Sequence, residues 1–507
     1  MTIFKNSVLA CGVILLGLSS CNKEMLRQNA PDLPTSDNFY TSKEKALSGL
    51  SAAYSQLEDF VAWDDFVEAR SVREFYREDF VEPGADASNY PWWTEHFNFT
   101  FTSGNPAIEL AWSDQYRGIA YTNQVLENVA AMKPGTIDDA SRKMILAEAR
   151  FLRAYYHFRL LQNFERIIIR DKVVEAETLF KATSTRPEVY DFIINDLKAS
   201  VGDLPLRSKR PATELGRVTK GAAEAYLGKV YLYRAGEEPS GAANYYVQAG
   251  TAFGNVVTSG EYQLETNFMG MFNGTVKNGT ESIFELQQTA DASNGAYYRS
   301  YQSTWIAAAE LGGYGEIYAT PRLLTEMKKE GKVAAGLYDP RLYATLVFED
   351  PYYTDPVAMR VYGYTYDETF GDGSGIAAFK KWVPADINQL GRSLAINVPL
   401  MRYADVMLMY AEALNQQAKY ADASEQIDQL RTKRGMPALH LSAKTEIFDQ
   451  IVHERVMEFT LESSRYYDLR RWGLLQQNMQ AAGRSFSMEK AFYPLPLKET
   501  INNPLAK

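Results

Sequence analysis

Histidines are the side chains that most often bind metal ions or transfer protons, and this chain has four: His96, His157, His440 and His453. No two of them stand at the spacing of a metal-binding motif. The segment from His453 to Met457 begins like the helical motif of zinc proteases, but Met457 occupies the position of the second histidine. We therefore expect neither a metal site nor a cofactor.

Paired carboxylates could hydrolyse glycosidic bonds if they lay on the two sides of a cleft. The chain has 63 acidic residues, so some pair must be close by chance, and an exported glycoside hydrolase remains an alternative. The C-terminal part carries a cluster of alternating charges: Glu454, Arg455, Glu458, Arg465, Asp468, Arg470 and Arg471. Such charges can form a site, but more often they form ion pairs on a helix face, so we interpret the cluster as architectural. We expect no catalytic residues.

Aromatic rings could bind sugars, because the C–H faces of a sugar ring pack on indoles and phenols. Aromatic residues make up 13% of the chain, a content that suits packed helices equally well. The segment Tyr90-Pro91-Trp92-Trp93 places two tryptophans in a polar stretch, where they cannot easily both be buried. Either at least one of them contacts a ligand, or one fills the core beneath a loop. If these tryptophans lie in a loop, replacing either of them with alanine should weaken ligand binding and leave stability nearly unchanged.

The first residues have the order of a bacterial export signal. Lys5 precedes an apolar run from Val8 to Leu18, which is shorter than the roughly 20 residues that span a bilayer, and small residues precede Cys21. This order predicts a lipoprotein signal peptide over residues 1–20, with the lipid on Cys21. The alternative is an ordinary cleaved signal with an incidental cysteine. The other cysteine, Cys11, lies inside the signal, so we expect no disulfide in the mature chain.

The net charge disfavours one class of partner. It is -10 for the whole sequence and becomes -11 when Lys5, the only charged residue of the predicted signal, is removed. An acidic chain without a long basic run repels phosphate backbones. We therefore expect no nucleic acid partner.

Helices must position these residues. Residues 21–37 are mostly polar and predict a tether between the lipid and the folded part. A first helix should begin near Ser42, which is a suitable cap. Apolar residues recur at steps of three and four in three further segments, which predicts helices over Ala147 to Phe164, Arg217 to Arg234 and Asn397 to Asn415.

Several of these helices have two apolar faces, which is typical of helices packed between layers. They resemble tetratricopeptide units with an irregular repeat. The helical period lapses from about Glu82 to Asn105 and from Gly260 to Ile396, where short strands such as Ser282 to Leu286 or Tyr343 to Phe348 are expected. We predict a mainly α fold of tetratricopeptide-like helix pairs with long, loop-rich excursions that contain short strands.

Short motifs follow one another in a fixed order along nearly all of the mature chain. They include Trp112-Ser113-Asp114-Gln115-Tyr116-Arg117-Gly118, Ala147-Glu148-Ala149-Arg150-Phe151-Leu152-Arg153, Gly216-Arg217-Val218-Thr219-Lys220, Pro399-Leu400-Met401-Arg402-Tyr403 and Arg465-Tyr466-Tyr467-Asp468-Leu469-Arg470-Arg471-Trp472. Each motif alone is weakly specific. In this order they resemble the SusD/RagB family of Bacteroidetes-type outer-membrane nutrient-binding lipoproteins.

The resemblance implies a SusD-like fold in one domain over residues 38–507, with a helical half over about 38–260 and a RagB/SusD half over about 261–507. It implies a lipoprotein of the outer membrane, at the cell surface, that binds oligosaccharide or polysaccharide without cleaving it. The ligand would be delivered to a SusC-like TonB-dependent transporter as partner. A helix-repeat adaptor that holds a protein complex together is an alternative from another class.

The resemblance also points to site residues. In the family, the loop before the Trp112 helix and a second loop past mid-chain often supply the sugar site. By position, these loops predict ligand contacts by Tyr90, Trp92, Trp93, Tyr298, Trp305 and Tyr314. For Trp305, packing in the core is the alternative.

We expect Cys21→Ala to abolish membrane attachment, because the lipid on Cys21 is the only anchor that we predict and stable attachment depends on acyl chains. Partition of cell extracts between detergent and aqueous phases, followed by immunoblotting, measures the effect. The variant should be found in the aqueous phase or as the unprocessed precursor. Wild-type amounts of it in the detergent phase would contradict the lipoprotein prediction.

Overall fold

The computed structural model describes residues 39–57, 66–289, 302–333, 336–391 and 394–506. The predicted signal peptide, Cys21 and the predicted tether lie outside the described residues. Within the described ranges, no helix is long and apolar enough to cross a membrane. The fold is mainly helical with a few short strands, which confirms the predicted fold class.

Long helices dominate the first half of the described chain. Their bounds are α3 (Lys43–Ser55), α4 (Phe66–Phe75), α5 (Pro91–Asn98), α6 (Pro106–Ala131), α7 (Asp139–Asn163), α8 (Arg186–Val201), α9 (Lys220–Glu237) and α10 (Ala242–Val257). Ser42 caps α3 as predicted, since its side chain accepts a hydrogen bond from the backbone N–H of Lys45 at 3.4 Å.

The second half begins with short helices and ends with longer ones. The short ones are α11 (Gly270–Asn273), α12 (Gln302–Ile306), α13 (Pro321–Met327), α14 (Pro340–Thr345), α15 (Pro351–Thr354) and α16 (Tyr366–Phe370). They are followed by α17 (Tyr403–Gln416), α18 (Tyr420–Lys433), α19 (Lys444–Phe459), α20 (Arg465–Arg471), α21 (Leu475–Ala481) and α22 (Leu497–Asn502).

The strands form two-stranded antiparallel sheets that join distant parts of the chain. The pairs are β1 (Val81–Pro83) with β3 (Ile317–Ala319), β2 (Ser282–Leu286) with β6 (Val398–Arg402), and β4 (Leu346–Val347) with β5 (Ala378–Phe379). The predicted strand Ser282 to Leu286 is confirmed.

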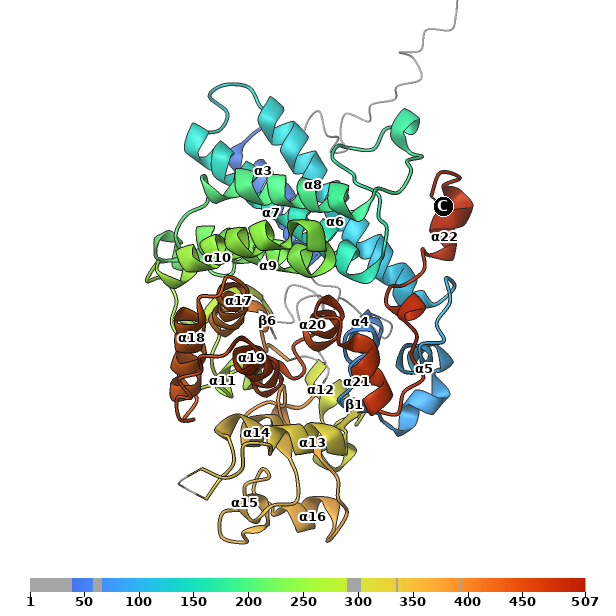
Figure 1. Ribbon diagram of the computed structural model, residues 1–507. Helices are drawn as coiled ribbons and strands as arrows, with labels where there is room; N and C mark the ends of the chain where they lie inside the picture. Colours follow the sequence, from blue (N-terminus) through green and yellow to red (C-terminus); the bar gives the residue numbers. More distant parts are fainter. Residues whose placement is uncertain (1–38, 58–65, 290–301, 334–335, 392–393, 507) are drawn as a thin grey trace, which may run out of the picture.

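The long helices form a stack in which each packs against the next in sequence (Figure 1). α6 to α10 follow one another in this way, and α10 also lies against α17, which packs on α18 and α19. Helix α7 is buried on both sides, with Phe151, Tyr155 and Tyr156 in the core. The two apolar faces seen in the sequence are therefore explained by neighbours on both sides.

The predicted helix over residues 397–415 is wrong in its first residues. Val398–Arg402 forms β6, and α17 begins only at Tyr403. Pro399 lies opposite Glu285 of β2 in this ladder. Proline is tolerated because β6 is an edge strand, and pairing with β2 outweighs the helical period of the sequence.

Two further predictions of local structure are corrected. Residues 343–345 belong to α14 and not to a strand, because Asp339 caps that helix by accepting the N–H of Arg341 at 2.8 Å and Pro340 occupies its first turn. The stretch from Glu82 to Asn105, expected to be a loop, contains α5, which begins at Pro91.

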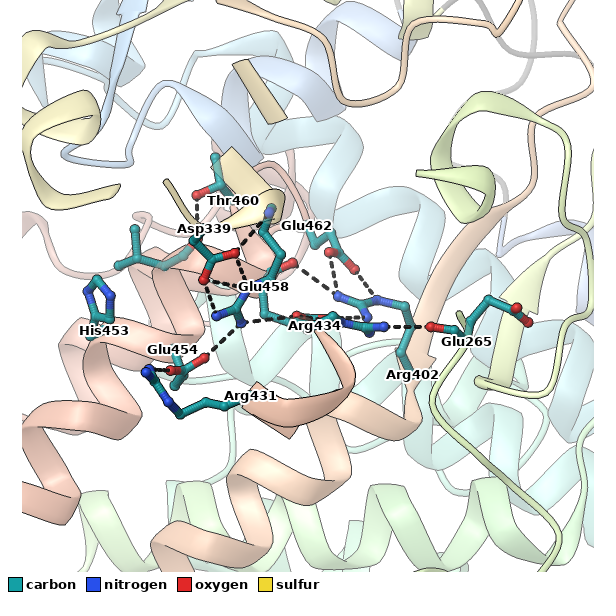
Figure 2. A network of polar contacts seen from close by, with 12 residues as sticks. Glu265, Asp339, Arg402, Arg431, Arg434, His453, Glu454, Glu458, Thr460 and Glu462 are labelled. Carbon is teal, nitrogen blue, oxygen red and sulfur yellow. Dashed lines mark hydrogen bonds and ion pairs between the residues drawn. The ribbon is translucent and has the colours of Figure 1, made fainter. Parts of the chain in front are cut away.

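A network of buried ion pairs joins β2 and β6 to the C-terminal helices (Figure 2). Arg402, the last residue of β6, contacts Glu281 beside β2, Glu458 of α19 at 2.9 Å and Glu462 at 2.7 Å. Arg434, which follows α18, contacts Glu281 at 2.9 Å and Glu458 at 2.7 Å. Elements far apart in sequence therefore share one set of charges.

The network continues along α19 (Figure 2). Arg341 of α14 contacts Glu454 at 2.7 Å and Glu458 at 3.3 Å, and Arg431 of α18 contacts Glu454 at 2.6 Å. All four side chains are buried. Burial alone would raise the pKa of Glu458, but the guanidinium groups around it, led by that of Arg434, hold that pKa well below its ordinary value.

The rest of the charge cluster is buried as well, except for Arg465, which is partly exposed. Arg455 contacts Asp405 of α17 at 2.8 Å and Asp468 of α20 at 2.6 Å, and Arg471 contacts Glu412 of α17. These pairs run between elements and not along one helix face. We therefore assign the cluster a role in packing the helices.

Two buried histidines are neutral in the fold. His157 of α7 donates from Nδ1 to the carbonyl of Arg153 at 2.8 Å and accepts at Nε2 from the N–H of Arg170 at 3.3 Å. His96 of α5 accepts from the Tyr493 hydroxyl at 2.9 Å and donates to Asn105 Oδ1 at 3.1 Å. These tautomers follow from the hydrogen-bond partners. Burial lowers the pKa of each histidine to about 3.

We expect the stability of the protein to fall as the pH drops below about 6.5. An unfolded histidine titrates near that value, so between about pH 3 and 6.5 the unfolded state binds protons that the folded state excludes. Each histidine then contributes a loss of up to about 1.4 kcal/mol per pH unit. Urea unfolding at several pH values between about 5 and 7 measures the slope.

The matched variant for this experiment is His96→Gln/His157→Gln. It should be less stable at pH 7, because glutamine fits the two sites imperfectly, but its stability should depend less on pH in that window. The window lies above the ordinary carboxyl pKa values of about 4, and the comparison of variant with wild type cancels the contribution of any carboxyl whose pKa the fold raises, such as Glu78. An unchanged slope would contradict the assignment.

Candidate functional site

Trp93 of α5 lies in the centre of an aromatic cluster. Its side chain is 1% exposed and packs edge-on against Tyr76, Trp92 and Trp305, with ring centroids 6.4, 5.8 and 6.1 Å away. Trp305 of α12 is fully buried. Neither ring has a face available to a ligand, so we correct their predicted role from ligand contact to support of the cluster. The physical reason is that α5 turns Trp93 and His96, three residues apart, to one buried face.

Tyr90 extends this cluster to the surface. It immediately precedes α5 and stacks on Trp93, with ring centroids 4.3 Å apart and an angle of 17° between the planes. Its side chain is 39% exposed. Tyr90 is therefore a surface ring that is held in place by a buried one.

Tyr314 is held to the same cluster through the backbone. Its N–H donates to the carbonyl of Thr304, the neighbour of Trp305, at 2.7 Å. The next residue, Gly315, approaches Gly84 so closely that a Cβ on Gly84 would lie 1.8 Å from its carbonyl oxygen. Only glycine fits there. Tyr314 is 40% exposed, so a second surface ring stands beside the paired strands β1 and β3.

The other predicted site residues differ in their surroundings. Trp92 is partly buried and packs against the core, while its carbonyl accepts a hydrogen bond from the Asn105 side chain at 2.9 Å. Tyr298 lies outside the described residues. Tyr90 and Tyr314, with the accessible part of Trp92, thus form the candidate site, which we call the aromatic platform.

Polar side chains lie close to these rings in the sequence and are exposed. Asp86, Ser88 and Asn89 belong to the short helix η2 (Ala85–Asn89), and Glu310 belongs to η9 (Ala309–Leu311). They offer donors and acceptors for hydroxyl groups. No motif in the sequence marks these residues as part of a site, although Asp86 and Asn89 stand within four positions of Tyr90 and could have been found from that proximity.

Glu78 has the raised pKa expected of a general acid. Burial and the neighbouring charge of Asp79 raise the pKa of Glu78 well above its ordinary value. Its side chain is buried, however, and Asp79 is held by Arg322 at 2.6 Å and Arg465 at 2.9 Å. A carboxyl in this position does not face a substrate. Across the described ranges, no group of three histidine, cysteine or acidic side chains could hold a metal ion.

The chain matches known families over most of its length. The profile described as "SusD family" matches residues 280–503, and the profile described as "Starch-binding associating with outer membrane" matches residues 45–232. Together they cover both halves of the described chain.

Individual proteins agree with this assignment. The chain is 27% identical to a SusD-like protein of Bacteroides ovatus over 93% of this chain and 83% of that one. It is 26% identical to SusD-like protein P2 of Formosa agariphila over 97% and 96% of the two chains.

Solved structures share the fold. A SusD superfamily protein from Bacteroides vulgatus superposes with a TM-score of 0.79 at 24% identity, over 92% of this chain and 99% of that one. A laminarin-binding SusD-like protein superposes with a TM-score of 0.73 at 22% identity, also over 92% and 99%. The motif order, the helical stack and these matches agree, and the chain belongs to the SusD/RagB family.

Proposed function

We propose that this protein binds a glycan at the cell surface and passes it to a TonB-dependent outer-membrane transporter. The observation that carries the proposal is the aromatic platform, in which Tyr90 presents an exposed ring on a buried aromatic cluster and Tyr314, whose backbone is hydrogen-bonded beside that cluster, is also exposed. Sugar rings pack their C–H faces on such rings, while nearby polar side chains bind the hydroxyl groups.

Relatives support a carbohydrate ligand. One matching profile is described as starch-binding, and one protein of the same fold is described as laminarin-binding. Both ligands are glucose polymers, so soluble starch and laminarin are the first glycans to test. The family resemblance supports the transporter as the recipient.

The predicted lipid on Cys21 supplies the membrane attachment in this proposal. The profile that matches residues 45–232 describes association with the outer membrane, which agrees with a lipid-anchored protein there. An anchored binding protein raises the local concentration of ligand at the transporter.

We expect Tyr90→Ala/Tyr314→Ala to weaken glycan binding by about 1–3 kcal/mol for each stacking face lost, by analogy with other aromatic platforms. The double variant is preferred, because removing Tyr90 alone uncovers Trp93, which could take its place. Stability should fall little, since both rings are about two-fifths exposed. Affinity electrophoresis and calorimetry with laminarin and soluble starch measure binding, and thermal unfolding measures stability.

Phe180→Ala is the matched control, because Phe180 is a 50% exposed aromatic residue that lies between α7 and α8. It should bind like the wild type. If the platform variant also binds like the wild type, the glycan site lies elsewhere.

The same samples test the hydrolase alternative, since release of reducing ends in molar excess over protein would indicate catalysis. If the wild-type protein binds no glycan and a protein complex fails to assemble without it, the result would favour the helix-repeat adaptor.

Trp92 and Trp93 should behave differently from each other. Trp93→Ala removes a buried indole and should cost about 3–5 kcal/mol of unfolding free energy, whereas Trp92→Ala should cost less because its side chain is only partly buried. This corrects the expectation that both substitutions affect binding more than stability. Chemical denaturation of the two variants measures the difference, and equal losses would contradict the burial assigned to Trp93.

A further inference from the structure

A hollow lies on another part of the molecule, between α6, residues 168–179 and α22. Its volume is about 490 Å³, and its lining includes no residue of the aromatic platform. Pockets that hold small molecules commonly measure about 300–1,000 Å³. The walls are mostly apolar and are formed by Trp112, Tyr116, Ile119, Ile168, Val173 and Leu179. Figure 1 shows α22 at the edge of the molecule, beside the C-terminus.

Hydrogen bonds hold the walls in place without a ligand. The Tyr116 hydroxyl donates to the carbonyl of Ile168 at 2.9 Å and accepts its N–H at 2.7 Å. Asn123 donates to the carbonyls of Arg170 and Lys172 at 3.0 and 2.8 Å. On the opposite side, the Trp112 indole donates to Glu499 of α22 at 3.2 Å. The Tyr116 hydroxyl and the Trp112 indole N–H are thus already hydrogen-bonded within the protein.

Apolar side chains are exposed at the hollow and on the segments that form it. Val174 and Leu179 line it and are 41% and 51% exposed, and Ile501 of α22 is 70% exposed. The Asn503 side chain donates to the carbonyl of Lys181 at 2.9 Å, which ties these two segments together. Exposed apolar side chains that gather at a hollow are typical of binding sites.

The charges at this hollow differ from those of the chain as a whole. The chain is acidic, but the lining contains three cations and two carboxylates. Lys498 pairs with Glu109 at 3.4 Å, and the Arg170 guanidinium donates to two backbone carbonyls. Among the described residues, the Lys172 ammonium has no ion-pair partner.

We propose that this hollow binds a small amphipathic carboxylate, with its apolar body against Trp112 and Leu179 and its carboxylate at Lys172. The volume, the preformed apolar walls and the available cation all fit this class of ligand. The accessible wall surface is mostly apolar, so a glycan, whose hydroxyl groups all need donors or acceptors, fits less well than an amphipathic ligand. The proposal is therefore independent of the function assigned to the aromatic platform.

Decanoate and its neutral counterpart decanol test the proposal by isothermal titration calorimetry on the folded protein. Decanoate should bind saturably, and more tightly than decanol. Ala120 lies exposed on α6 and lines the hollow, so Ala120→Trp should fill the space and reduce decanoate affinity by about tenfold or more. Lys172→Gln should reduce it by about threefold, which corresponds to an exposed ion pair.

Ala131→Trp is the matched control, since Ala131 is an exposed alanine 11 residues further along the same helix, about 16 Å away along its axis. It and Tyr90→Ala/Tyr314→Ala should bind decanoate like the wild type. Absence of saturable binding, or wild-type affinity in both Ala120→Trp and Lys172→Gln, would overturn the proposal. Equal affinity for decanol would overturn the role of Lys172. Self-association of the wild type that Ala120→Trp abolishes would assign the surface to a second copy of the chain instead.

Discussion

The fold of the C-terminal half depends on buried charges that must all be paired at once. Arg402, Arg434 and Glu458 come from β6, the end of α18 and α19, and each is at most 2% exposed. An ion left unpaired in such surroundings costs about 3–5 kcal/mol, so no one of these elements can move without the others. The network therefore acts as a geometric constraint more than as a source of net stability, since desolvation offsets much of the attraction between the charges.

This constraint extends to β3, the strand that follows Tyr314 of the aromatic platform. β3 leads directly into α13, where Glu326 contacts His453 of α19 at 2.8 Å. Asp79, just before β1, is held by Arg465 of α20 and Arg322 of α13. The start of β1 pairs with the end of β3, so these contacts tie one end of the paired strands to the helical body. A surface held in this way loses little conformational entropy on binding, which favours affinity for weakly interacting ligands such as sugars.

Helix α6 links the two candidate binding surfaces. At its start, Asn105 caps the helix and also holds His96 and the Trp92 carbonyl of α5, beneath the aromatic platform. Further along, Trp112 and Tyr116 form walls of the hollow beside α22. Helix α6 is packed against α7. It can therefore carry residues of both surfaces while each surface binds its own ligand. The two surfaces differ in kind, since one offers exposed rings among polar groups and the other an apolar hollow with a cation.

The helical scaffold and the family could be predicted from the amino-acid sequence, because apolar residues at steps of three and four and the order of short motifs are local properties of the chain. The segment of Tyr90 and Trp93 could be identified in the same way, but which ring is exposed and which is buried depends on Trp305, more than 200 positions away. Likewise, β6 forms because β2 is there to pair with it. Contacts between distant segments leave no periodic trace in a single sequence, and for that reason strand pairing, burial and the partners of the buried charges appear only in the folded molecule.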